Sequence, residues 1–109
     1  MNAKKVSPQS SCVRQLKTLA DSTRLAILEL LESGPKHVYE MNAVLKLEQS
    51  LLSHHLKVLR SEGLIVATRD GKAVLYQLGS RVTSVNGYRT IDLGCCFLCF
   101  DSITNKLQV

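Results

Sequence analysis

Residues 49–64 read QSLLSHHLKVLRSEGL, and this stretch decides the fold of the chain. Leu52, Leu56 and Leu59 recur at the spacing of one buried stripe along an α-helix, while polar and basic residues fall mostly on the opposite side. Gly63 then stops the helix, and the apolar, β-branched run that follows indicates a strand. A helix that leads directly into a strand is typical of the junction in a winged helix.

The segments around this stretch predict a mainly α-helical fold with one small β-hairpin. Apolar residues at helical spacing indicate further helices, and Asp70-Gly71 between two extended runs is a strong hairpin signal. The predicted elements are helices over 10–19, 22–32 and 38–47, strands over 64–68 and 74–78, and a short helix around 81–86. The apolar tail from Thr90 onward receives no assignment. Together these elements predict a winged helix-turn-helix.

Composition favours a soluble protein with a polyanionic partner. Lys and Arg number 14 against 9 Asp and Glu, a net charge of +5. Apolar runs are too short to span a bilayer, and the first residues lack the apolar region of a secretory signal. We expect a cytoplasmic protein without membrane contact, and at 109 residues dimerisation would supply burial that its own core lacks.

Polar and basic side chains on the 49–64 helix and the hairpin are candidate DNA contacts. A helix in the major groove presents hydrogen-bonding side chains to base edges, while cations meet phosphates. Lys57 and the two cations at the wing tip are expected at the backbone, the latter also near a minor groove. The predicted contacts are Gln49, Ser50, Ser53, His54, Lys57, Arg69 and Lys72.

The adjacent pair His54 and His55 is not predicted to hold a metal ion. Neighbouring helical residues point about 100° apart and rarely ligate one ion together. We therefore expect His54 to contact DNA and His55 to pack inside the protein.

Three segments resemble the ArsR/SmtB family of metalloregulatory repressors. They are LADSTRLAIL at 19–28, QSLLSHHLKVLR at 49–60 and GLI at 63–65, within a similarity that covers about residues 16–78. The resemblance implies a homodimer that binds double-stranded operator DNA. It also implies release from the operator when a thiophilic metal, a metalloid or a redox agent binds.

The chain departs from the family pattern at a few positions. Ser22 stands where the family usually has proline, and Glu48 stands where a capping serine is common; both suit a helix start. His37 and Tyr39 align with the cysteines of the family's frequent Cys-Val-Cys metal box, which is absent here. No sensory role follows for His37, which we expect to be a partly exposed loop residue.

Cys95, Cys96 and Cys99 form a Cys-Cys-x-x-Cys cluster, whereas Cys12 stands alone. On an extended strand Cys95 and Cys99 would lie about 13 Å apart, but a turn or helix would bring all three sulfurs to one centre. Cys12 is a possible fourth ligand from either subunit. Three thiolates suit arsenite or antimonite, while zinc or cadmium usually needs a fourth ligand. The tail is similar to that of some arsenite sensors of the ArsR family.

These observations predict a repressor that arsenite or antimonite releases from its operator. Residues 1–9 are expected to be a flexible basic arm, 10–79 the DNA-binding domain, and 80–109 a segment for dimerisation and sensing. A thiol-redox, persulfide, zinc or cadmium response is an alternative, and the cysteines could also be buried apolar residues. A small dithiol oxidoreductase or metal carrier is a third class. Catalysis is not expected, because the sequence has no P-loop, dinucleotide fingerprint or nucleophile elbow.

Overall fold

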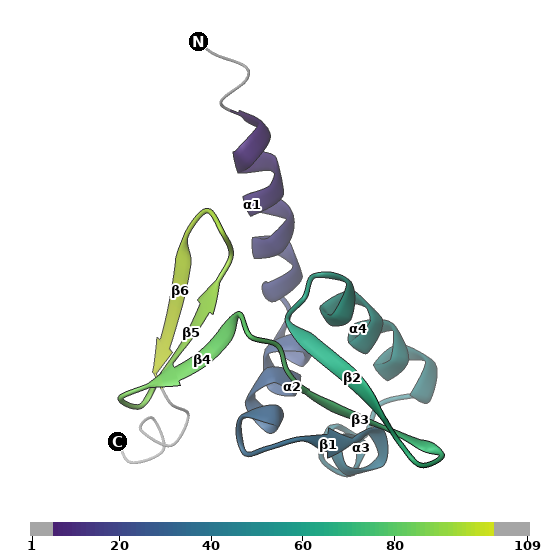
Figure 1. The fold of residues 1–109 in the computed structure, drawn as a ribbon. Coiled ribbons are helices and arrows are strands. Elements are labelled where there is room, and N and C mark those ends of the chain that lie inside the picture. The colour runs from purple at the N-terminus through teal and green to yellow at the C-terminus, as the bar shows by residue number, and fades with distance from the viewer. Residues whose placement is uncertain (1–5, 102–109) are drawn as a thin grey trace.

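Four helices and two three-stranded sheets make up residues 6–101, the part of the chain that this computed structural model describes (Figure 1). The helices are α1 Val6–Leu19, α2 Ser22–Glu32, α3 Val38–Leu45 and α4 Gln49–Ser61. The strands are β1 Lys36–His37, β2 Ile65–Asp70, β3 Ala73–Leu78, β4 Val82–Val85, β5 Tyr88–Asp92 and β6 Phe97–Asp101. This order of helices and strands is that of a winged helix-turn-helix with an added C-terminal sheet.

The hydrophobic core lies between α2, α3, α4 and the first sheet. Ile27 and Leu28 of α2, Met41 of α3, and Leu52 and Leu59 of α4 are fully buried. The apolar stripe predicted along α4 is therefore confirmed, and its burial holds that helix against α2 with its polar side outward.

The wing is an antiparallel hairpin, as predicted. β2 and β3 pair from Ile65 opposite Leu78 to Asp70 opposite Ala73, which leaves a two-residue turn that begins at Gly71. Gly71 has a φ of 66°, a conformation that glycine adopts without a side-chain penalty. β1 pairs with β3 and adds a third strand to this sheet, which the sequence did not predict.

The short helix predicted around 81–86 is wrong, because this segment forms β4. It pairs with β5 through a turn at Asn86 and Gly87, both of which have positive φ. Asn-Gly is itself a strong hairpin signal, and β-branched residues favour the strand before it. The unassigned tail continues as β5 and β6, so the second sheet has the order β4-β5-β6.

α1 begins at Val6, four residues before the predicted start at Ser10. Residues 6–9 of the predicted basic arm are therefore helical, and residues 1–5 lie outside the described part. Pro8 is compatible with this start because the first-turn N–H groups of a helix have no partner within the helix.

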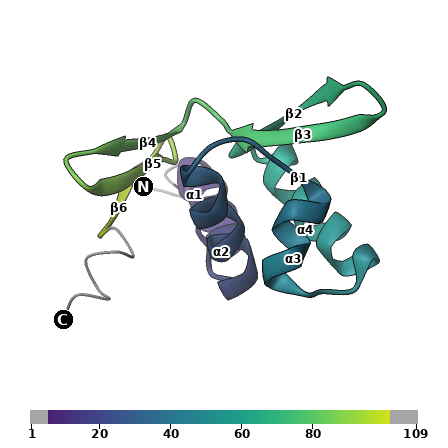
Figure 2. The ribbon, with the colours of Figure 1, turned by 90° about the horizontal axis from the view of Figure 1, so that it is seen from below.

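The C-terminal sheet lies beside α1 and α2, on the side away from the wing (Figure 2). Ile91 and Leu93 are fully or almost fully buried and belong to the same apolar cluster as α2 and α4. Arg89 of β5 is only 2% exposed, and its guanidinium meets Glu32 at 2.9 Å and Glu29 at 3.5 Å, both on α2. Apolar burial and paired charge therefore attach this sheet to the winged helix.

Candidate functional site

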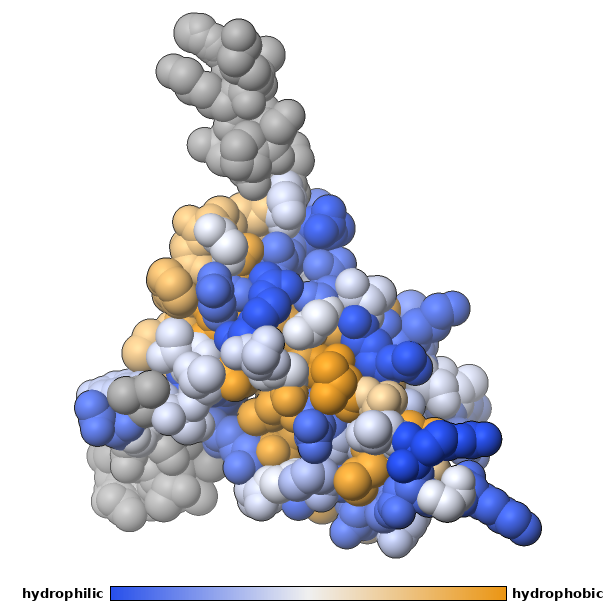
Figure 3. All heavy atoms as spheres, in the orientation of Figure 1, coloured by the Kyte–Doolittle hydropathy of each residue, from blue (hydrophilic) through white to orange (hydrophobic). Residues whose placement is uncertain are grey.

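The predicted DNA contacts form the solvent-exposed side of α4 and the tip of the wing. All seven are exposed: Gln49, Ser50, Ser53, His54 and Lys57 on α4, Arg69 on β2, and Lys72 in the β2–β3 turn. Figure 3 shows hydrophilic side chains gathered along the right-hand edge of the molecule, over α4 and the hairpin tip. This surface offers hydrogen-bonding groups and positive charge; contact of these residues with DNA stays a prediction.

Polar contacts behind α4 fix its orientation. The Nε of Arg24 on α2 donates a hydrogen bond to Nδ1 of His55 at 3.1 Å, and its Nη1 donates to the carbonyl oxygen of Thr18 at 3.2 Å. His55 is 7% exposed, whereas His54 next to it is exposed. The separation of the two histidines into one outward and one packed side chain therefore agrees with the prediction.

Asp21 is the N-cap of α2, as predicted. Its Oδ1 accepts a hydrogen bond from the backbone N–H of Arg24 at 3.0 Å. Burial raises the pKa of Asp21, but this hydrogen bond and the positive charge of the Arg24 guanidinium lower it, and the pKa is lowered overall. The ionised carboxylate therefore stabilises the folded state.

Replacing Asp21 tests this cap through pH. Because its folded pKa is lowered, its charge stabilises the fold fully above the ordinary value of 3.8, and this contribution is lost as pH falls through the folded pKa. Asp21→Ala should cost about 1 kcal/mol at neutral pH in urea unfolding. The Asp21→Asn variant keeps a capping oxygen, so its free energy of unfolding at neutral pH should be close to that of the wild type. In acid it should lose less stability than the wild type does. An equal acid loss in Asp21→Asn would contradict the role of the charge.

His37 has a structural role that sequence reasoning missed. It is the N-cap of α3, where its backbone N–H donates to Oε1 of Glu40 at 2.7 Å, and its Nε2 lies 2.9 Å from Oδ2 of Asp70. The hydrogen bond from the His37 backbone lowers the pKa of Glu40. Tyr39 stacks on the imidazole and is 71% exposed. The loop assignment of His37 was therefore wrong; the Glu three residues later was the available capping-box signal.

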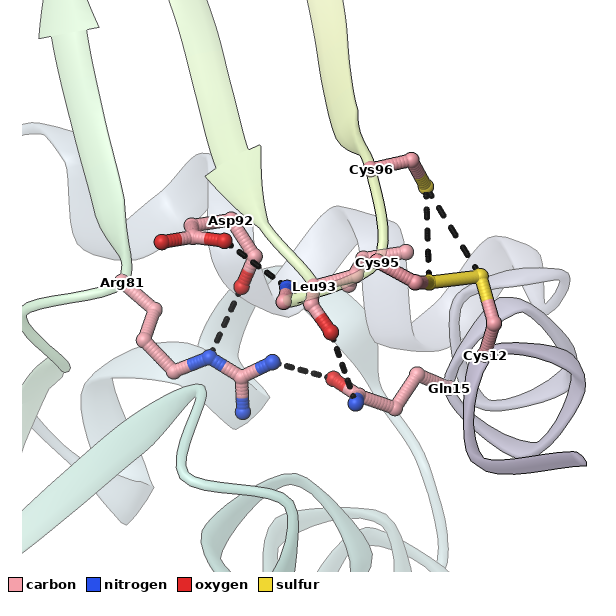
Figure 4. The surroundings of a disulfide bond; sticks show 8 residues. Cys12, Gln15, Arg81, Asp92, Leu93, Cys95 and Cys96 are labelled. Carbon is pink, nitrogen blue, oxygen red and sulfur yellow. Dashed lines mark hydrogen bonds between the residues drawn. A yellow bond between two sulfur atoms is a disulfide. The ribbon is translucent and has the colours of Figure 1, made fainter. Parts of the chain in front are cut away.

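Cysteines from the two ends of the chain meet beside α1 (Figure 4). Cys12 of α1 forms a disulfide with Cys95 in the turn between β5 and β6, with 5.9 Å between the Cα atoms. The Sγ of Cys96 lies 3.9 Å from each of the two bonded sulfurs. The three sulfurs thus form one group within 4.8 Å, which we call the sulfur cluster.

The expected convergence of Cys95, Cys96 and Cys99 is wrong in one member. Cys99 lies within β6, opposite Thr90, and is exposed. The prediction needed a turn or helix over this segment, whereas Phe97–Asp101 is extended and carries Cys99 away along the strand. Cys12 takes the third place in the cluster, a pairing across 83 residues that local spacing does not reveal.

Comparison with known proteins agrees with this geometry. The profile described as "Bacterial regulatory protein, arsR family" matches residues 21–66. The transcriptional activator HlyU of Vibrio cholerae is 37% identical over 81 residues, which cover 73% of this chain and 75% of HlyU. The chain belongs to the arsR family. Its arsR-family fold is also that of the solved structure of reduced HlyU, with a TM-score of 0.63, 34% identity, and coverage of 72% of this chain and 83% of that chain.

Two further proteins similar to this chain come from mycobacteria. The regulator NmtR of Mycobacterium tuberculosis is 43% identical over 63 residues, 58% of this chain and 52% of NmtR. The chain thus spans about half the length of NmtR. A Mycobacterium bovis structure titled a homodimeric winged helix-turn-helix DNA-binding domain superposes with a TM-score of 0.62 at 29% identity, covering 72% of each chain. The family and fold predictions are confirmed. Among the described residues, no helix is long and apolar enough to cross a membrane.

Proposed function

We propose that this chain is a homodimeric repressor that binds double-stranded operator DNA and is released by arsenite or antimonite. The observation that carries the proposal is the sulfur cluster of Cys12, Cys95 and Cys96 in a chain of the arsR family. The exposed polar side of α4 supports DNA binding. The proposed function of the chain includes no catalysis. We retain residues 10–79 as the DNA-binding part and 80–109 as the sensing and dimerisation part, to which α1 contributes Cys12 and exposed apolar side chains.

The donor set fits a trivalent metalloid. Reduction of the Cys12–Cys95 disulfide by a thiol reductant supplies two electrons and two protons, which gives three thiols with Cys96. Each thiol then passes its proton to one hydroxyl group of arsenious acid; three waters leave and three arsenic–sulfur bonds form. Soft thiolates favour this ligand, whereas zinc usually takes a fourth donor, and the group found in the described residues contains these three sulfurs alone.

Apolar side chains that face solvent support the proposed homodimer. Val13 and Leu16 on α1 are 46% and 39% exposed, and Phe97 at the start of β6 is 70% exposed. The Mycobacterium bovis relative is named as a homodimer. A second copy packed against α1 and β6 would cover these side chains.

Thiol oxidation is a second candidate for the signal, and the disulfide itself favours it. Cys12 and Cys95 lie on separate elements, so making or breaking their bond changes how α1 and the β5–β6 turn are held together. If thiol oxidation is the signal, the reduced and oxidised proteins differ in operator affinity in the absence of any metalloid.

The first experiment is fluorescence anisotropy of reduced protein on a duplex from upstream of its own gene, titrated with arsenite at fixed salt. Release at one arsenite per sulfur cluster would support the metalloid function. Tight binding that arsenite leaves unchanged, but that a disulfide-forming oxidant abolishes, would select thiol oxidation instead. Tight binding unaffected by either agent would contradict both signals and leave the DNA function.

Lys57→Ala tests the DNA face. If Lys57 meets a phosphate, the variant should bind most duplexes more weakly. The slope of log affinity against log salt should become shallower by about 0.9 for each subunit, or about 1.8 for the homodimer. Lys17→Ala removes an equal charge from the exposed side of α1 and serves as the control. An unchanged slope in Lys57→Ala would argue against the phosphate contact.

A further inference from the structure

We propose that Gln15 and Arg81 form a relay that transmits the state of the sulfur cluster to the C-terminal end of α4. This proposal deepens the proposed function and rests on it for its biological role. The contacts themselves run unbroken from the cysteines to the helix that carries the predicted DNA contacts. Figure 4 shows the part of this path that ends at Arg81.

The relay begins at the turn that carries the cysteines. Leu93 and Cys96 close this turn, since the N–H of Leu93 donates to the carbonyl oxygen of Cys96 at 2.9 Å. Cys95 lies inside the turn and is bonded to Cys12 on α1. A change in the Cys12–Cys95 link therefore acts on the position of this turn relative to α1.

Gln15 contacts this turn directly and therefore responds to its position. It lies three residues after Cys12, and thus on the same side of α1. Its Nε2 donates to the carbonyl oxygen of Leu93 at 3.0 Å, and its Oε1 accepts from Nη2 of Arg81. The Gln15 residue is 7% exposed. Because a buried amide that loses a partner carries a desolvation cost, movement of Leu93 also disturbs the bond to Arg81.

Arg81 connects Gln15 to the end of α4, the helix with most of the predicted DNA contacts. Its Nε donates to the carbonyl oxygen of Asp92 at 2.7 Å, at the end of β5, and its Nη1 donates to the carbonyl oxygen of Glu62 at 2.6 Å. Glu62 is the C-cap of α4. Carbonyls at a helix C-terminus lack partners within the helix and attract positive charge, so the guanidinium completes this helix end. One planar cation thus joins α1, β5 and α4.

The expected consequence is that α4 ends differently in the two states of the cluster. With the disulfide formed, Gln15, Leu93 and Arg81 hold the contacts described above. With the thiols free, Cys12 and Cys95 are no longer linked, and the Leu93–Cys96 turn takes a new position. The hydrogen bond from the Arg81 guanidinium to the Glu62 carbonyl oxygen then changes. As a result, α4 takes a different position relative to the operator DNA. A metalloid bound to the three sulfurs would join α1 to this turn again.

Amide hydrogen exchange of Glu62, Gly63 and Leu64 tests the relay without DNA. In the wild type, reduction of the disulfide should change exchange at these amides by about 5- to 150-fold, the usual range of coupling between sites. Arg81→Met keeps an unbranched stem but loses the donors, and it should reduce that change to less than about 2-fold. Gln15→Met, which removes both amide contacts, should do the same and serves if Arg81→Met does not fold.

Lys17→Met, on the exposed side of α1, is the matched control and should respond as the wild type does. The relay is overturned if wild-type exchange is unaffected by reduction, if both variants keep the full response, or if the control loses it as well. Anisotropy on the operator duplex is measured with the same samples. The anisotropy is also measured after arsenite is added to the reduced protein. If exchange responds to reduction but neither reduction nor arsenite changes DNA affinity, the relay stands and the proposed function is refuted.

Discussion

Replacing Gly79 with alanine should lower the free energy of unfolding by about 1–3 kcal/mol, as expected for overpacking. A Cβ at this position would lie 2.6 Å from the carbonyl oxygen of Gly63 and 3.3 Å from the backbone of Leu64. These atoms belong to the main chain between α4 and β2, so no side-chain rotation relieves the contact. The Gly79 N–H also donates to the Leu64 carbonyl at 2.9 Å, which fixes the close approach.

The same change should weaken DNA binding, because Gly79 directly follows β3 and packs against the main chain that joins α4 to the wing. Urea unfolding and operator anisotropy measure the two effects. Lys17→Ala, on the exposed side of α1, is the control and should keep both the stability and the operator affinity of the wild type. Gly79→Ala with stability within about 0.5 kcal/mol of wild type would contradict the close approach.

Cys12→Ser should weaken arsenite-triggered release while operator binding persists. The variant leaves only two sulfurs of the cluster, which removes one of the three arsenic–sulfur bonds. We expect the arsenite concentration for half release to rise at least about 10-fold, within the usual range of coupling energies. The measurement is the anisotropy titration of reduced protein at fixed salt. Cys96→Ser should behave in the same way.

Cys99→Ser is the matched control for this set, because Cys99 is exposed on β6 and outside the sulfur cluster. It should keep the wild-type arsenite response. The reverse result, with response lost in Cys99→Ser and kept in Cys12→Ser, would reinstate the arrangement expected from sequence spacing. A response kept in every single variant would contradict a three-sulfur site.

Local patterns account for what the sequence predicted well. The stripe of Leu52, Leu56 and Leu59 depends only on helical periodicity, and the Asp70-Gly71 hairpin depends only on turn chemistry; both are confirmed. Each signal lies within one element, so no knowledge of distant contacts is needed. The exposure of the predicted DNA contacts on α4 follows from the same helical periodicity.

The errors arise where distant parts of the chain meet or where a local signal was underused. The Asn86-Gly87 turn was present in the sequence, but the helical spacing of Val82 and Val85 was preferred. The place of Cys12 in the cluster depends on how α1 packs against the C-terminal sheet, which no spacing shows. Arg81 has no motif around it, and only the folded chain reveals its three partners.

The disulfide also has a consequence for the unfolded chain. It closes a loop of 83 residues, which in the chain-entropy view destabilises the denatured ensemble by about 4.5 kcal/mol. Small domains have a total stability of only about 5–15 kcal/mol. The reduced protein, which alone offers three thiols, is thus the form closest to unfolding. A metalloid that links Cys12 to Cys95 would close the same loop again, so the proposed effector should also raise the melting temperature of the reduced protein.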